Sequence, residues 1–145
     1  MRRLIAIDPG KQKCGLLLAD LDKEFVLDGI VAHHTAVLDL VKRWQSQGNL
    51  EGILLGNGTT SKYWFGLLKD FASVQIVEEK GTTLRARERY WELWPPEILL
   101  RWLPRGLMIP SQNLDAVAAL VLLEDHLGMK LKWKGTKNFK IWREQ

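Results

Sequence analysis

Three acidic residues of this 145-residue sequence stand at the ends of apolar runs or at the start of one, where a carboxylate could take part in chemistry. Asp8 follows a short apolar run and precedes Pro-Gly, Glu79 follows a second apolar run, and Asp115 opens the most apolar stretch of the chain. Carboxylate oxygens are preferred ligands of hard cations such as Mg²⁺ and Mn²⁺. Each residue alone also has a structural explanation, because Asp favours turns and the first turn of helices.

The order of elements predicts an α/β fold that brings these acids to one edge. Apolar runs typical of strands lie at residues 3–7, 14–19, 25–32, 51–55 and 74–77. Helical spacing predicts helices at residues 35–47, 63–71, 83–94, 97–103 and 112–127, the last with Ser111 as N-cap. Short connectors make the first three strands antiparallel, while the later strands follow helices and run parallel. We expect a mixed five-stranded sheet, three antiparallel then two parallel strands, with helices on both faces.

In this sheet, the strands ending at Ile7, Leu55 and Val77 lie side by side and run parallel. Open α/β sheets place their sites at the carboxyl ends of such strands. Asp8, Glu79 and the polar turn at residues 56–61 all come there. Like charges 4 Å apart repel by ~4 kcal/mol at an effective dielectric of about 20, so a bound metal should stabilise the fold.

Three segments resemble motifs of the YqgF/RuvX family, which belongs to the ribonuclease H-like nucleases and is related to RuvC-type Holliday junction resolvases. AIDPGKQKCGLLLAD resembles the first motif, VEEKGTTLRARE the acid-Glu-Arg segment, and LDAVAALVLLEDHL the last helix. The resemblance spans residues 3 to about 127. It implies a ribonuclease H-like fold and a catalytic, metal-ligating triad of Asp8, Glu79 and Asp115. Glu78 is the alternative to Glu79, which we prefer because the family motif places the catalytic acid second.

The resemblance also implies an activity and its partners. It indicates an endonuclease that uses Mg²⁺ or Mn²⁺ in a two-metal mechanism. The implied substrates are structured RNA, such as the precursor of small-subunit ribosomal RNA, or branched DNA, such as a Holliday junction. Since the related resolvases act as dimers, a homodimer is a further possibility.

The basic charge of the chain is concentrated at its C-terminal end. Residues 129–145 carry six Lys or Arg and one Glu, whereas residues 1–128 have a net charge of −1. Lysines alternate with apolar residues in MKLKWK, which predicts a C-terminal hairpin with a lysine-lined face. We therefore expect a domain at 1–128 and a basic extension at 129–145. The candidate nucleic-acid-binding residues are Lys11, Lys13, Asn57, Thr59, Lys80, Lys130, Lys132 and Lys134.

A non-catalytic nucleic-acid-binding module is the second hypothesis. The loop LLGNGTTSK replaces the Gly-Leu-Pro type loop of the family and is more similar to the YqgF-like domain of transcription-associated proteins, which is thought to bind without cutting. Lys80 also stands where the family has Arg. This replacement keeps the positive charge but loses the two-pronged hydrogen bonding of a guanidinium. In this hypothesis the GNGTTS turn binds phosphate at a helix start, and Trp133 and Trp142 are candidates for stacking on bases.

Several other classes are excluded by the sequence. The longest apolar run is eight residues, at 116–123, against the ~20 that a spanning helix needs. The N-terminus lacks a secretory signal pattern, so we expect a cytoplasmic protein without membrane contact. A lone Cys14 excludes an internal disulfide and metal sites built on several cysteines. A sugar-kinase-like phosphotransferase is rejected, because such enzymes clamp ATP between two domains and this length supplies one.

Overall fold

The computed structural model describes residues 2–79, 81–95, 114–134 and 141–142. Its centre is a mixed β-sheet with the strand order β5–β4–β1–β2–β3–β6. The strands are β1 (Arg3–Pro9), β2 (Lys13–Asp20), β3 (Phe25–His33), β4 (Leu50–Gly56), β5 (Val74–Val77) and β6 (Ile141–Trp142). Strands β1, β2 and β3 are antiparallel neighbours, while β4 and β5 run parallel to β1, and β6 runs parallel to β3.

This arrangement confirms the predicted mixed sheet of three antiparallel strands followed by two parallel ones. The three N-terminal strands form a meander because only three residues join β1 to β2 and four join β2 to β3. The chain then crosses over through helices, which is why β4 and β5 are parallel to β1. The short strand β6, at the outer edge of β3, is an addition to the predicted five strands.

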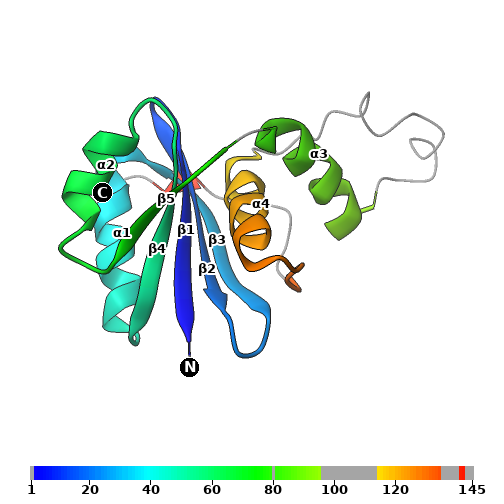
Figure 1. Ribbon diagram of the computed structural model, residues 1–145, viewed down its shortest axis with the longest axis horizontal. Coiled ribbons are helices and arrows are strands. Elements are labelled where there is room, and N and C mark those ends of the chain that lie inside the picture. The colour runs from blue at the N-terminus through cyan, green and yellow to red at the C-terminus, as the bar shows by residue number, and fades with distance from the viewer. Residues whose placement is uncertain (1, 80, 96–113, 135–140, 143–145) are drawn as a thin grey trace.

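Helices cover both faces of the sheet. They are α1 (His34–Ser46), α2 (Ser61–Leu68), α3 (Thr82–Leu93) and α4 (Asp115–Leu127). Helices α1 and α2 lie on one face, α4 lies on the other, and α3 packs on the outer side of α4 (Figure 1). Among the described residues, no helix combines the length and apolar character needed to cross a membrane. The predicted helix at 97–103 and the predicted N-cap Ser111 lie outside the described residues.

Alternation along β1 decides which face each side chain joins. Ile5 and Ile7 belong to the core beneath α1 and α2, whereas Leu4 and Ala6 belong to the core beneath α4. Successive residues of a strand point to opposite faces, so Asp8 lies on the α4 face. The first acid of the predicted site therefore shares a face with the helix that carries Asp115.

The C-terminal tail differs from the predicted hairpin. Lys132 forms a parallel bridge with Phe25, and Ile141–Trp142 pair in parallel with Val31 and Ala32. Both described segments of the tail therefore run in the same direction along β3, whereas a hairpin requires two antiparallel segments. The physical reason is the unpaired outer edge of β3, which offers its backbone groups to the tail. The period-2 prediction itself is confirmed, because Leu131 is buried in the core while the neighbouring lysines are exposed.

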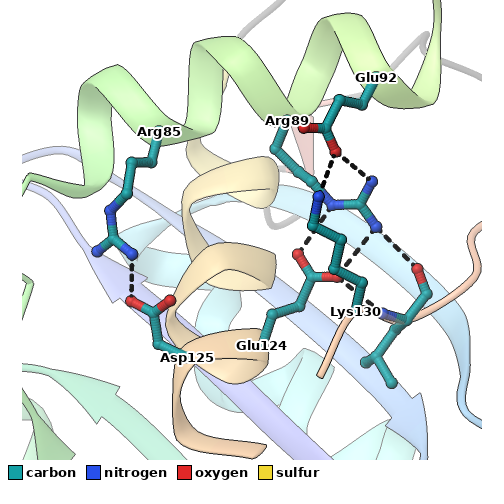
Figure 2. A network of polar contacts seen from close by, with 7 residues as sticks. Arg85, Arg89, Glu92, Glu124, Asp125 and Lys130 are labelled. Carbon is teal, nitrogen blue, oxygen red and sulfur yellow. Dashed lines mark hydrogen bonds and ion pairs between the residues drawn. The ribbon is translucent and has the colours of Figure 1, made fainter. Parts of the chain in front are cut away.

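A network of ion pairs ties α3, α4 and the tail together (Figure 2). Arg89 of α3 donates to both carboxylate oxygens of Glu124 of α4, at 2.9 and 3.0 Å, and to the carbonyl oxygen of Leu131, at 2.9 Å. The backbone N–H of Leu131 donates to Glu124 in turn, at 2.7 Å. Glu92 binds both Arg89 and Lys130, at 3.2 and 3.0 Å. The nearly buried Glu124 thus accepts three hydrogen bonds, two from Arg89 and one from Leu131.

Candidate catalytic and metal site

Asp8 lies near the C-terminal end of β1, where it pairs with Gly15 of β2. Its surroundings raise the pKa of its carboxyl group from 3.8 to about 8. Burial is the largest cause, followed by a hydrogen bond and the negative charge of Glu79, and then by the charge of Asp115. In the metal-free chain, Asp8 therefore holds a proton at neutral pH, and its carboxyl group lies within hydrogen-bonding reach of Glu79.

Glu79 comes from the segment that follows β5 and turns its carboxylate over the end of β4. A Cβ atom placed on Gly56 would lie 2.0 Å from Oε1 of Glu79, so this glycine provides the space for the carboxylate. The Oε1 atom is buried without a hydrogen-bond partner within the described part of the chain. Glu78, the alternative acid, is exposed to solvent. It is Glu79 that contacts Asp8.

Asp115 is the first residue of α4 and lies beside β2. A Cβ atom on Gly15 would lie 1.9 Å from the backbone oxygen of Asp115, so only glycine lets the start of α4 approach the sheet here. Since Gly15 is the partner of Asp8 in the sheet, α4 begins next to the first acid. The negative charge of Asp115 contributes to the raised pKa of Asp8.

The structure thus joins two of the three predicted acids in direct contact and places the third within electrostatic reach. In residues 2–79, 81–95, 114–134 and 141–142 there is no group of three His, Cys, Asp or Glu side chains arranged to hold a metal ion. The donor set still fits a hard cation, because an orphaned, buried carboxylate oxygen of Glu79 lies beside the carboxyl group of Asp8.

The predicted nucleic-acid-binding residues fall into two groups. Lys11 and Lys13 lie in and after the β1–β2 connection, close in sequence to Asp8, and Asn57 and Thr59 are exposed in the β4–α2 loop. Lys80 lies outside the described residues.

The second group comprises Lys130, Lys132 and Lys134, and the last two lie at the opposite end of the sheet. Lys132 pairs with Phe25 of β3. Phe25 pairs with Asp20 of β2, and Asp20 pairs with Arg3, the first residue of β1. Asp8 is five residues further along β1, about 17 Å at ~3.3 Å per residue. The Nζ atoms of Lys132 and Lys134 lie 5.9 and 5.2 Å from the Phe25 ring centroid.

Other tail residues also have structural partners. Lys130 is paired with Glu92. Trp133 packs against Gly29 and against Trp94, with 5.3 Å between the two ring centroids. The indole of Trp133 is therefore part of the packing between the sheet and α3, not an open platform for bases.

The two glycines next to Asp8 are site features that the sequence analysis missed. Gly15 on β2 and Gly56 on β4 make room for the start of α4 and for Glu79, respectively. A glycine inside a strand weakens it and often marks a close approach of another backbone or side chain. That signal was present at Gly15, inside the apolar run at 14–19, but not at Gly56, which opens the predicted polar turn at 56–61.

No family model matches the sequence, and no curated protein matches it. Among solved structures, a similar chain is that of "T. thermophilus RuvC in complex with Holliday junction substrate". The two chains are 15% identical, the match covers 90% of this chain and 99% of that one, and the TM-score is 0.49.

Proposed function

We propose that this chain is a metal-dependent endonuclease of the RuvC-like class, in the manner of the YqgF/RuvX family, acting on structured RNA or branched DNA. The observation that carries the proposal is the contact between Asp8 and Glu79 on the α4 face, at the carboxyl ends of parallel strands, within electrostatic reach of Asp115. Burial, and then the neighbouring Glu79 and Asp115, raise the pKa of Asp8, and Oε1 of Glu79 is buried without a hydrogen-bond partner among the described residues. Proteins keep such arrangements mainly at functional sites.

The fit of this site to a cation defines the role of each acid. Asp8 and Glu79 supply the oxygen ligands for Mg²⁺ or Mn²⁺, and Asp115 completes the negative field from the start of α4. Held by these residues, such ions would supply activation of water and stabilisation of the leaving oxygen of a phosphodiester. Asp8 gives up its proton when it becomes a ligand. Lys11 and Lys13, in and after the neighbouring β1–β2 connection, orient the phosphate backbone by their charge.

The activity is tested with four-way DNA junctions and with a structured ribosomal RNA precursor, each with Mg²⁺ or Mn²⁺. We expect cleavage by the unmodified chain and a loss of about 100-fold or more in Asp8→Asn, which lacks the ligand charge. Asp39→Asn, at an exposed position of α1, is the matched control and should cut normally. Cleavage by Asp8→Asn at the rate of the unmodified chain would contradict the proposal.

A non-catalytic nucleic-acid-binding module is the second candidate. The observation that favours it is the absence, among the described side chains, of a three-ligand group ready to hold a metal ion. This candidate predicts binding that weakens with salt but survives loss of all three acids. Binding by a triple variant of Asp8, Glu79 and Asp115, together with no cleavage by the unmodified chain under any ion, would favour it. The homodimer and the cytoplasmic location stay predictions.

A further inference from the structure

The loop after β4 is joined to the segment that carries Glu79 by two hydrogen bonds from one residue. The backbone N–H of Asn57 donates to the carbonyl oxygen of Val77, at 2.9 Å. The side-chain Oδ1 of Asn57 accepts from the backbone N–H of Glu79, at 3.0 Å. Asn57 therefore continues the pairing of β4 with β5 beyond the last ladder pair, Gly56 with Val77, and fixes the backbone of Glu79.

The neighbouring glycines determine where the Glu79 side chain lies. A Cβ atom on Gly56 would lie 2.0 Å from Oε1, 2.8 Å from Cδ and 2.9 Å from Cγ of Glu79. A Cβ atom on Gly58 would lie 3.4 Å from Oε2. The atoms that clash with an alanine at position 56 belong to a flexible side chain and not to the backbone, so the substitution would displace the carboxylate and leave β4 intact.

We propose that Gly56 and Asn57 are positioning residues that hold Glu79 against Asp8. This inference rests on the proposed function, because it assigns their role in the same site. It also changes the role expected for Asn57. Its Oδ1 serves an internal hydrogen bond, whereas contact with a phosphate would use its Nδ2–H groups as donors.

The chemistry of the amide provides a test that separates these two roles. In Asn57→Asp, the oxygen that accepts from Glu79 is kept, while the donors that a phosphate contact requires are replaced by a negative charge. In Asn57→Ala, both are lost. If Asn57 positions Glu79, the Asn57→Asp variant should keep the cleavage activity that Asn57→Ala loses. If Asn57 binds phosphate, both variants should lose activity to a similar extent.

The first experiment compares Gly56→Ala with Gly66→Ala, whose added Cβ atom meets nothing within 4 Å. We expect Gly56→Ala to lower kcat by about 100-fold, since a displacement of about 1 Å is sufficient for such a loss. Its KM for the nucleic acid should stay within about twofold, because a positioning role acts on Glu79 and not on substrate binding. Gly66→Ala should cut normally. Normal kcat in Gly56→Ala would overturn the inference.

The second experiment measures the Glu79 backbone directly in the full-length chain. Amide hydrogen exchange at Glu79, followed by nitrogen-15 NMR, should accelerate about tenfold or more in Asn57→Ala and stay slow in Asn57→Asp. Mn²⁺ binding, measured by titration without nucleic acid, should weaken in Gly56→Ala and in Asn57→Ala. Exchange at Glu79 that is unchanged in Asn57→Ala, or a pure KM effect that Asp fails to rescue, would overturn the inference.

Cleavage, amide exchange and Mn²⁺ binding together distinguish failure of the proposed function from failure of the positioning role. If the unmodified chain cuts no nucleic acid, the proposed function fails, but exchange at Glu79 and Mn²⁺ binding still decide whether Asn57 and Gly56 hold the carboxylate. If the chain cuts and neither variant changes kcat, exchange or Mn²⁺ binding, the positioning role fails alone.

Discussion

At the scale of single residues, ionisation of Asp8 lowers the free energy of unfolding of the chain. Burial and two neighbouring acids make its ionised form unfavourable, which is why its pKa lies near 8. The unfolded chain releases this proton near pH 4 and the folded chain only near pH 8. Ionisation therefore lowers the free energy of unfolding as pH rises through this window, and the loss is complete above the folded-state pKa.

Asp8→Asn should therefore be more stable than the unmodified chain at alkaline pH in the absence of metal. The amide has the size of the acid but no proton to lose, so the stability difference should grow between pH 4 and pH 8 and level off above. The growth should be about 1.4 kcal/mol per pH unit at most, the limit for one proton. Urea unfolding in EDTA at several pH values measures it. A difference that stays constant over this window would contradict the raised pKa.

Metal binding should show the opposite dependence on pH. Because Asp8 must release its proton to become a ligand, Mn²⁺ affinity should rise with pH up to about 8, by up to tenfold per unit, and then reach a plateau. Isothermal titration at pH 6, 7, 8 and 9 measures this affinity and the protons released. Asp8→Asn is the control and should bind weakly without this dependence. An affinity of the unmodified chain that is flat from pH 6 to 8 would show that Asp8 is not a ligand.

The residues of the site were predictable only in part. Strand ends and a helix start indicated Asp8, Glu79 and Asp115 as candidates, but they could not show that the carboxyl groups of Asp8 and Glu79 are in direct contact. The spacing also left Glu78 open, because adjacent residues beyond a strand end have no fixed face. Contact of Glu79 with Asp8 depends on the space at Gly56, which the sequence did not reveal as part of the site.

At the scale of elements, the prediction succeeded where periodicity and connector length decide the outcome. The five core strands and helices α1 to α4 lie within a few residues of their predicted positions, since each has an apolar pattern with a clear period. The prediction of a hairpin in the tail was wrong because no periodicity or connector length fixes the pairing partner there. A lysine–apolar alternation predicts an extended segment but not its partner, and the free edge of β3 was the better partner.

The ion pairs between α3 and α4 differ in burial, and this difference predicts their energies. The side chains of Arg89 and Glu124 are 12% and 9% exposed, whereas those of Arg85 and Asp125 are 41% and 49% exposed. Glu124→Gln should lower the free energy of unfolding by about 3 kcal/mol, because it leaves a nearly buried guanidinium with less compensation. Asp125→Asn, on the same helix, should cost less than about 1 kcal/mol. Chemical unfolding measures both, and equal losses would contradict this ranking.

At the scale of the whole molecule, Lys132 and Lys134 of the tail lie at the opposite end of the sheet from the acidic site, whereas β6 pairs with Val31 and Ala32 at the level of Asp8. Lys132 and Lys134 lie beside Phe25, about 17 Å along the strands from the level of Asp8. A phosphate at the acids is therefore beyond their reach. If both ends contact one substrate, the nucleic acid must extend along the molecule for several nucleotides, and the two ends must contribute differently to binding and to cleavage.

Replacing Lys132 and Lys134 together by Ala should therefore weaken binding without slowing the chemical step. Each lost contact to duplex phosphate should reduce the slope of log affinity against log salt by ~0.9, while cleavage at saturating substrate stays unchanged. Lys11→Ala with Lys13→Ala, beside the acids, is the comparison and should lower the cleavage rate as well. Binding titrations from 50 to about 200 mM salt and single-turnover cleavage separate the two effects. A tail variant with an unchanged salt slope would remove the tail from the binding surface, and one with slower single-turnover cleavage would contradict the separation of the two ends.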